Sequence, residues 1–456
     1  MKQREKDRQH CLEWSKSFPQ KVDCNNVISE SITVSATAVK VDEDTNRQHH
    51  GVDEGGLVNK AGEILVVLRR GRLFTIDMSG AQLAMVDMAD LATQGGNHDD
   101  SYDWYDELLI ANGTVIVIGY SNSRGGTEIV LFNLREGGRL EHRATYNLRS
   151  DDYYSGENYA SRLVGGKLIL YTTRTLPDEP ANLDWLPAMR RWRPGATVAG
   201  FERIASWDRV FKQAAPLGAF PTVHTMVTCD PSAVEFTCEG SILLADYLSV
   251  YYASPTAGYA WTRNWSNYPE GKPAANLYRI PFDGAPISAL QVHGDPQNQL
   301  AFLESDDGHL NVVVQENETE GASSTSLLRV PLNSFGDGSD SAPPDNYRVL
   351  ARDFEWPSTR FIGEFVLVGD ASRYGVNRLV ATRWPNRSSE IVTLPLQHGV
   401  DRIEAMGNDA IVIGPHGTDL GMTTIKLAGA PVATTTLVVE NARESESRTH
   451  GFLYRA

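Results

Sequence analysis

The sequence predicts an all-β fold, a β-propeller of about seven four-stranded antiparallel blades, with six to eight blades allowed. Three observations predict it. Apolar runs of strand length recur along the chain, turns rich in Gly, Asn and Asp separate them, and the resulting hairpins return roughly every 40 to 65 residues. The predicted units begin near residues 57, 105, 159, 240, 299, 360 and 400.

The clearest strands are apolar along their whole length, as in TVIVIGY from Thr114 and EFVLVGD from Glu364. Such runs are typical of strands buried on both faces, in parallel α/β sheets or in stacked antiparallel sheets. Links such as Asn112-Gly113 and Gly165-Gly166 are too short for the crossover of about a dozen residues that a parallel pair needs. Antiparallel blades are therefore predicted, with a two-sheet sandwich as the structural alternative.

One interval interrupts the hairpin rhythm. We expect an N-terminal extension over 1–44, a propeller domain over 45–456 and, within it, an insertion over 176–221. In the insertion, ANLDWLPAMRR and FERIASWDRVFKQ space their apolar residues as a helix does, with Trp207 and Val210 or Phe211 on one face. The insertion is therefore expected to carry short helices.

A motif opens the predicted propeller. The segment from Thr45 to Gly62 contains a T-N-x-Q step followed by Gly51, Val52, Asp53 and Glu54. It resembles the entry motif of a bacterial secreted β-propeller family that is distantly related to WD40 repeats and has no determined function. Three positions depart from the family pattern, namely Gly56, Asn59 and Ala61.

Two later segments resemble the same family, 156–163 and 447–454. The resemblance implies an exported protein, often lipid-anchored, that continues past the last of these segments. Because the chain opens on charged residues instead of an apolar leader, and stops at Ala456, it is expected to be a fragment or to lack both termini.

Composition excludes some partners. The net charge of −16 would repel a phosphate backbone, so no nucleic acid is expected. No apolar run approaches the roughly 18 residues of a membrane span, and no transmembrane segment is expected. Four cysteines form two local pairs, Cys229 with Cys238 and Cys11 with Cys24. Short even spacing favours disulfides, and hence a secreted, periplasmic or cell-surface location, over free thiols in the cytoplasm.

Metal-site candidates are weak. Asp99, Asp100 and Asp103 lie in the densest acidic stretch and are a candidate calcium site, although a solvated loop is the favoured interpretation. His49 and His50 precede Asp53 and Glu54, yet the favoured interpretation is that these carboxylates anchor a loop through backbone hydrogen bonds. Apart from calcium, no cofactor is expected.

Two aromatic groups are the candidates for recognition. In the insertion, Trp185 and Trp192 accompany Arg190 and Arg191, and a second cluster contains Trp261 and Trp265. Loops on a rigid scaffold often carry binding sites. The alternatives are a solvated loop for the arginines and core packing for the tryptophans.

No catalytic constellation is recognisable, and no G-x-S-x-G elbow is present. The sequence is therefore interpreted as a non-enzymatic binding or scaffold propeller of the bacterial envelope or exterior, a monomer whose partner is a protein or a glycan. The alternative is an exported polysaccharide-acting hydrolase or lyase with its active site at the propeller channel.

Overall fold

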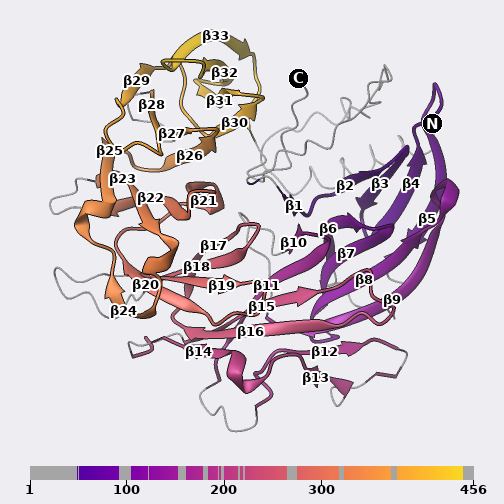
Figure 1. Cartoon of the computed structure of the whole chain (residues 1–456). Coiled ribbons are helices and arrows are strands. Elements are labelled where there is room, and N and C mark those ends of the chain that lie inside the picture. The colour runs from indigo at the N-terminus through magenta and orange to yellow at the C-terminus, as the bar shows by residue number, and fades with distance from the viewer. Residues whose placement is uncertain are drawn as a thin grey trace, which may run out of the picture. The chain divides into compact units, whose positions relative to one another are not determined.

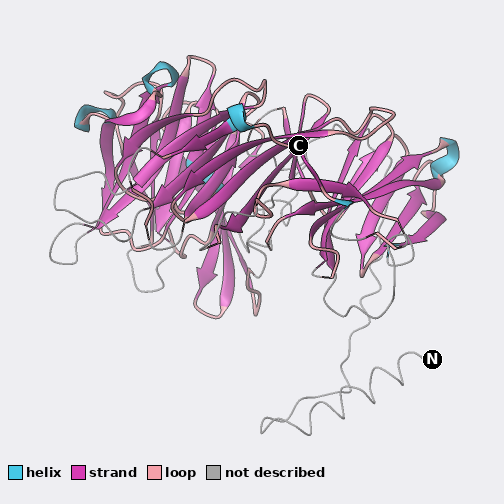
Figure 2. Ribbon diagram, turned by 90° about the horizontal axis from the view of Figure 1, so that it is seen from below, coloured by secondary structure: helices cyan, strands magenta, loops and turns pink. Residues whose placement is uncertain are grey.

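Strands make up most of the chain that the structure describes. The computed structural model describes residues 49, 51–91, 104–121, 123–151, 161–177, 183–193, 195–196, 200–213, 216–218, 221–263, 275–317, 323–370 and 377–444. These residues belong to one compact unit, Glu43–Ala456. Their helices are short 3₁₀ turns (Figure 2): η1 (Glu136–Gly138), η4 (Trp207–Arg209), η5 (Gln299–Ala301), η7 (Leu332–Ser334) and η8 (Pro344–Asn346). Within the same ranges, no helix has the length and apolar character needed to cross a bilayer.

The described strands form seven sheets, numbered I to VII here in chain order (Figure 1). Sheet I contains β2 (Val58–Ala61), β3 (Ile64–Arg69), β4 (Arg72–Asp77) and β5 (Ala84–Asp90). Sheet II contains β6 (Trp104–Ala111), β7 (Thr114–Ser121), β8 (Gly126–Leu134), β9 (Leu140–Arg149), β12 (Ala188–Arg191) and β13 (Glu202–Arg203). Sheet III contains β1 (Val52–Glu54), β10 (Ser161–Val164), β11 (Lys167–Thr175), β15 (Thr222–Cys229), β16 (Cys238–Ala245) and β14 (Val210–Lys212).

The second half of the chain supplies the other four sheets. Sheet IV contains β17 (Leu248–Ala253), β18 (Ala257–Arg263), β19 (Ala275–Pro281), β20 (Ser288–Val292) and β24 (Asp337–Ser341). Sheet V contains β21 (Phe302–Ser305), β22 (His309–Asn317), β23 (Ser323–Pro331) and β25 (Tyr347–Arg352). Sheet VI contains β26 (Pro357–Ile362), β27 (Phe365–Asp370), β28 (Arg378–Arg383) and β29 (Val392–Pro395). Sheet VII contains β30 (Arg402–Met406), β31 (Asp409–His416), β32 (Asp419–Lys426) and β33 (Val432–Val439).

The predicted all-β class is confirmed, and sheets I, V, VI and VII have the predicted four antiparallel strands. Sheets II, III and IV are larger, because later or earlier segments add to their edges. Two of these additions are parallel, β14 beside β16 and β24 beside β20. An edge strand offers unpaired N–H and C=O groups, so a nearby extended segment gains hydrogen bonds by joining it.

The described part of the insertion over 176–221 consists of loops and short strands, with less helix than expected. Its described residues include β12, β13, β14 and the helical turn η4. Apolar spacing over so few residues is compatible with either a helix or a strand. These segments form strands because the edges of sheets II and III offer them hydrogen-bonding partners. Trp207, expected on an apolar helix face, is 57% exposed on η4.

Consecutive sheets pack face to face. Val66 of sheet I and Val117 of sheet II share one buried cluster, and similar clusters join each later sheet to the next, as Leu367 of sheet VI and Val412 of sheet VII show. Tight turns permit this stacking. Between β6 and β7, Asn112 and Gly113 have φ of 47° and 75°, the left-handed values that a two-residue hairpin turn requires.

Candidate functional site

Strand β1 of the entry motif is an edge strand of sheet III. Strand β1, which contains Asp53 and Glu54, pairs with β10 and places Glu54 directly opposite Arg162. Two segments that resemble the same family, far apart in the sequence, thus meet in one ladder. Gly55 follows, and a Cβ at this position would lie 2.6 Å from Oε2 of Glu107 and 2.8 Å from Oγ of Ser161.

Buried polar contacts fix this edge. Glu107 of sheet II accepts hydrogen bonds from the backbone N–H and the hydroxyl of Ser161. Arg162 donates to the Ser161 carbonyl at 2.7 Å and to Gln299 on η5. Burial raises the pKa of Tyr251 to about 12, while the nearby Arg162 opposes this rise. The contacts tie sheets II and III to η5, beside the strand that contains Asp53 and Glu54.

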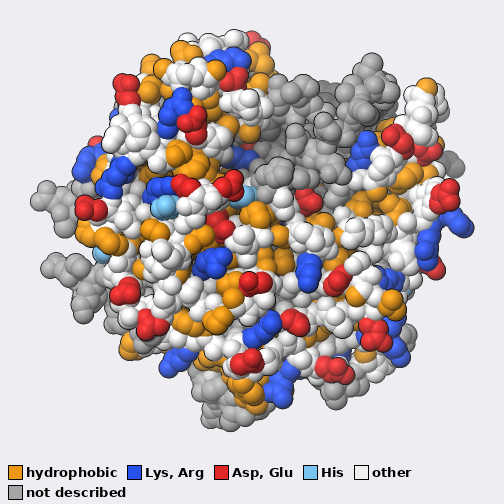
Figure 3. Space-filling view, viewed as in Figure 1, with side chains coloured by type: hydrophobic (Ala, Val, Ile, Leu, Met, Phe, Trp, Pro, Cys, Tyr) orange, Lys and Arg blue, Asp and Glu red, His pale blue; other side chains and the backbone are white. Residues whose placement is uncertain are grey.

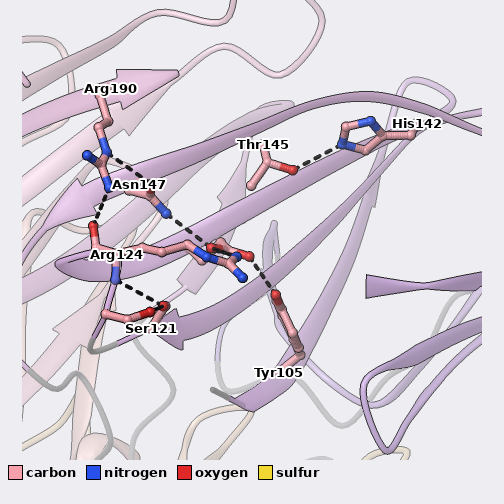
Figure 4. A network of polar contacts seen from close by, with 9 residues as sticks. Tyr105, Ser121, Arg124, His142, Thr145, Asn147 and Arg190 are labelled. Atoms are coloured by element: carbon pink, nitrogen blue, oxygen red, sulfur yellow. Dashed lines mark hydrogen bonds and ion pairs between the residues drawn. The ribbon is translucent and has the colours of Figure 1, made fainter. Parts of the chain in front are cut away.

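A second polar network occupies sheet II, at the end near residues 121–126 (Figure 4). Its centre is Glu128, which is fully buried. Glu128 forms an ion pair with Arg124 at 2.6 Å, and it accepts hydrogen bonds from Tyr105 at 2.5 Å and from Asn147 at 3.1 Å. The Glu128 carboxylate thus connects three strands, β6, β8 and β9, and the link between β7 and β8.

Arg190 of the insertion extends this network. β12 pairs with β9 and sets Arg190 opposite Asn147, so that its Nε donates to the Asn147 side chain at 3.2 Å. Its Nη2 donates to the carbonyl of Arg124 at 2.9 Å. These contacts bring the guanidinium of Arg190 beside that of Arg124, although only one buried carboxylate, Glu128, accompanies them in the network.

Aromatic rings cover the arginines. The guanidinium carbon of Arg190 lies 4.6 Å from the ring centre of Phe201, and that of Arg149 lies 4.8 Å from the same centre. Arg124 lies 5.4 Å from the ring centre of Trp192. We call these five residues, with Arg174, the arginine–aromatic cluster. Arg174 is included because Arg174 and Arg149 both donate hydrogen bonds to the Asp184 carbonyl, at 2.9 and 3.0 Å.

In the arginine–aromatic cluster, neighbouring arginines lower the pKa of Arg149 and that of Arg190. Burial lowers the pKa of Arg190, and the neighbouring Arg124 lowers it further. Burial likewise lowers the pKa of Arg149, with Arg174 as the next cause. A bound anion would relieve the repulsion between these guanidinium groups.

The structure brings together only some of the residues predicted from sequence. Arg190 and Trp192 join the cluster, and Arg191 is exposed, donating to the Arg143 carbonyl at 3.5 Å. Trp185 is 8% exposed and packs against Val223 and Ile242, while Trp261 is fully buried in the core of sheets IV to VI. Neither tryptophan offers a binding face, so for both the core alternative holds.

Several predicted residues lie outside the described ranges, namely Asp99, Asp100, Asp103, His50, Trp265, Cys11 and Cys24. The disulfide Cys229–Cys238 is present and joins paired positions of β15 and β16. In the part of the chain that the structure describes, no three His, Cys, Asp or Glu residues gather as a metal site.

Sequence reasoning missed Arg124, Glu128, Arg149 and Phe201. Glu128 could have been identified from the sequence, because a charged residue inside the apolar run TEIVLFNL needs a buried partner. No feature of the sequence indicates which residue is that partner.

Among the solved structures similar to the chain are forms of an apocarotenoid oxygenase. A mutant of the Synechocystis apocarotenoid oxygenase is 9% identical, with 78% of this chain and 97% of that chain covered and a TM-score of 0.33. The cobalt-substituted form of the same enzyme gives the same identity, coverage and TM-score, and its chimera with RPE65 is 10% identical over the same shares, with a TM-score of 0.31.

These neighbours contradict three predictions made from sequence. Because they are enzymes, the non-enzymatic binding or scaffold function and the absence of enzymatic activity are not retained. The cobalt-substituted neighbour contradicts the expectation that no cofactor apart from calcium is involved. With TM-scores of 0.31 to 0.33, the likeness transfers neither an activity nor a metal to this chain.

The family of the chain follows from a direct match. No curated protein matches the sequence. The family model described as a beta propeller domain matches residues 43–364, which is well over half of the 456 residues. This match agrees with the stacked antiparallel sheets and with the entry motif, and the chain therefore belongs to the beta propeller domain family.

Proposed function

We propose that the arginine–aromatic cluster binds an anionic glycan, one that carries carboxylate or sulfate groups. The observation that carries this proposal is the placement of Arg149 and Arg190 on one ring, that of Phe201. The guanidinium group of Arg190 repels that of Arg149, and an anion within reach of both would convert that repulsion into attraction. Guanidinium also matches the planar geometry of a carboxylate with two parallel hydrogen bonds.

The neighbouring groups favour a glycan over an acidic peptide. Asp151 lies 3.7 Å from Arg174, and the exposed Asp184 lies in the same group. A uronic acid ring carries hydroxyls that can donate to these carboxylates, whereas a run of acidic side chains has no such donors. Half-buried Trp192 adds an aromatic surface for the apolar face of a sugar ring.

The contrast with the rest of the molecule supports the same proposal. The chain carries a net charge of −16, and on the face shown in Figure 3 basic and acidic side chains are interspersed. A group of four arginines, of which Arg124 pairs with the buried Glu128 and Arg174 lies 3.7 Å from Asp151, departs from that mixed pattern. Because opposite charges attract at short range even on an acidic protein, the group selects for anions that can reach it.

Polygalacturonate, a polymer of uronic acid, is the probe for this proposal. Affinity electrophoresis should show binding by the wild type that weakens with salt. Arg149→Gln and Trp192→Ala should each weaken binding by about tenfold or more, while Arg69→Gln, which alters an exposed arginine of sheet I, should not. Release of reducing ends, followed in the same incubations, measures turnover.

Three outcomes would overturn the proposal. These are no binding at low salt, equal binding by the wild type and both cluster variants, and preference for polyglutamate over polygalacturonate. Dextran, a neutral polymer, serves as the control ligand.

We infer further that the seven sheets are the blades of one closed seven-bladed propeller. Val58, Val67, Phe74 and Met88 lie directly opposite one another across sheet I, on the face away from sheet II. Val58 and Met88 are 50% and 46% exposed in this row. A layer that covered this row would stabilise the fold, because it would remove apolar surface from water.

Sheet VII has the matching face. Ile413, Met422 and Leu437 form a row on its side away from sheet VI, and Leu437 is 58% exposed. Contact between the two rows would close the ring. Met88→Lys should then lower the unfolding free energy, and adding Leu437→Glu should restore part of the loss. Additive effects of the two substitutions would contradict closure, and Val234→Lys, at a 98% exposed site, is the neutral control.

We also propose that the protein is exported, as the resemblance to secreted bacterial propellers implies. The disulfide Cys229–Cys238 supports this, because such bonds persist in oxidising compartments. Cell fractionation with thiol labelling tests it: an exported chain is expected outside the cytosol with both cysteines protected, and a cytosolic chain with labelled thiols would contradict export.

A further inference from the structure

The structure has a polar cavity beside the disulfide, away from the arginine–aromatic cluster. Its volume is ≈ 240 Å³, and it lies where β11, β15 and β16 of sheet III meet the turn that follows β19 of sheet IV. Turn η4 of the insertion contributes Arg209 to its wall. We infer that this cavity binds one ring of a neutral sugar.

The wall carries groups of both signs. Lys167 and Arg209 supply positive charge, and Asp230, Glu239 and Asp283 supply negative charge. An anionic ligand would meet three carboxylates, and a cationic ligand would meet two cations. A hydroxyl group can donate to a carboxylate and accept from a cation at the same time, so a polyhydroxylated neutral ligand satisfies both kinds of group.

Hydrogen-bonding groups are arranged in two rows on one face of sheet III. Thr228 pairs with Glu239, and Met226 pairs with Ser241, so all four side chains face the cavity. The hydroxyls of Thr228 and Ser241 add donors and acceptors for a sugar. Met226 and, from the opposite wall, Phe282 add an apolar surface for the C–H face of the ring.

The charged groups are held in place by their surroundings. Arg209 forms an ion pair with Glu239 at 3.1 Å, and Gly284, with φ of 83°, leaves room for its guanidinium: a Cβ there would lie 2.6 Å from Nη2. The hydroxyl and backbone N–H of Ser232 lower the pKa of Asp230, which keeps this group an ionised acceptor. A site of this kind needs little rearrangement to take a ligand.

Size and surroundings limit the ligand. Pockets for drug-sized molecules have about 300 to 1,000 Å³, so this smaller cavity suits a single ring. Trp207, which is 57% exposed, lies on the same turn as Arg209. A large exposed indole at this position offers a stacking surface for a sugar ring that extends from the cavity.

Saturation-transfer NMR with glucose, galactose, mannose and N-acetylglucosamine, each at about 10 mM, tests this inference. At least one sugar should bind to the wild type. Asp283→Asn and Lys167→Gln should each reduce its affinity about tenfold, the loss expected for one hydrogen bond to a charged group. The matched controls are Asp345→Asn and Lys212→Gln, which alter exposed residues elsewhere.

Two results would overturn the inference: no signal from any of the four sugars, or equal affinity of the wild type and both cavity variants. Polygalacturonate binding by the same variants separates this site from the arginine–aromatic cluster. Because the two sites share no residue, failure of one leaves the result for the other unchanged.

Discussion

Arg124 and Glu128 form a buried ion pair, with 2.6 Å between Nη1 and Oε2. Side chains from three further positions depend on it, because Tyr105 and Asn147 donate to the same carboxylate and Arg190 donates to the Asn147 side chain. The pair therefore supports the cluster that we propose as a ligand site.

Glu128→Ala should lower the free energy of unfolding by about 3–5 kcal/mol, because it leaves a buried guanidinium without its carboxylate. Urea unfolding at pH 7 measures this change. Glu141→Ala is the control, since its pair with Arg135 has side chains 55–56% exposed and should contribute nothing measurable. A loss no greater than that of the control would show that the buried pair does not stabilise sheet II.

Gly55→Ala should destabilise the protein by about 1–3 kcal/mol, the usual cost of forcing an extra methyl group into packed surroundings. The new Cβ would meet Glu107 and Ser161 at 2.6 and 2.8 Å and would push the entry motif away from sheet II. Denaturant unfolding checks the prediction. Gly336→Ala, where a Cβ meets nothing within 4 Å, should leave stability nearly unchanged. Equal effects of the two substitutions would contradict the close approach at Gly55.

Removing the disulfide by Cys229→Ala with Cys238→Ala should cost about 2–3 kcal/mol, the chain-entropy value for a loop of about ten residues. Thermal unfolding with and without reductant measures this loss. Reductant should lower the Tm of the wild type and leave that of the double variant where it is. A wild type indifferent to reductant would contradict a stabilising bond.

His224 should make stability depend on pH. Burial lowers the pKa of His224 to about 4, while its hydrogen bond to the Asp246 carbonyl opposes the shift. Below about pH 6.5 the unfolded chain takes up a proton at this position and the folded chain does not. This contribution is therefore fully present above pH 6.5 and is lost as pH falls toward 4, at about 1.4 kcal/mol per pH unit.

Unfolding of His224→Gln at several pH values isolates this effect. Relative to the wild type, the variant should lose less stability between pH 7 and pH 5. His309→Gln, at the partly exposed start of β22, should keep the wild-type dependence. Identical pH profiles for the wild type and His224→Gln would contradict the assignment.

Much of the strand content could be predicted from residue patterns. Strand β7 was visible as an apolar run, and Asn112-Gly113 as its hairpin turn, because both signals arise within a few residues. The insertion was misjudged. Its apolar spacing is compatible with a helix, but β12 pairs with β9 and β14 pairs with β16. No local sequence pattern predicts this pairing.

For the candidate site, the sequence alone indicated Arg190 and Trp192, since they cluster within three residues of each other. By itself it determined the all-β class, the hairpin rhythm, the entry motif and the net charge, because these follow from local order and composition. Only the tertiary structure decided that Arg149 and Arg190 share the ring of Phe201, and that Lys167, Arg209 and Asp283 line one cavity. These residues come from separate strands and turns, and sheet pairing and packing set their distances.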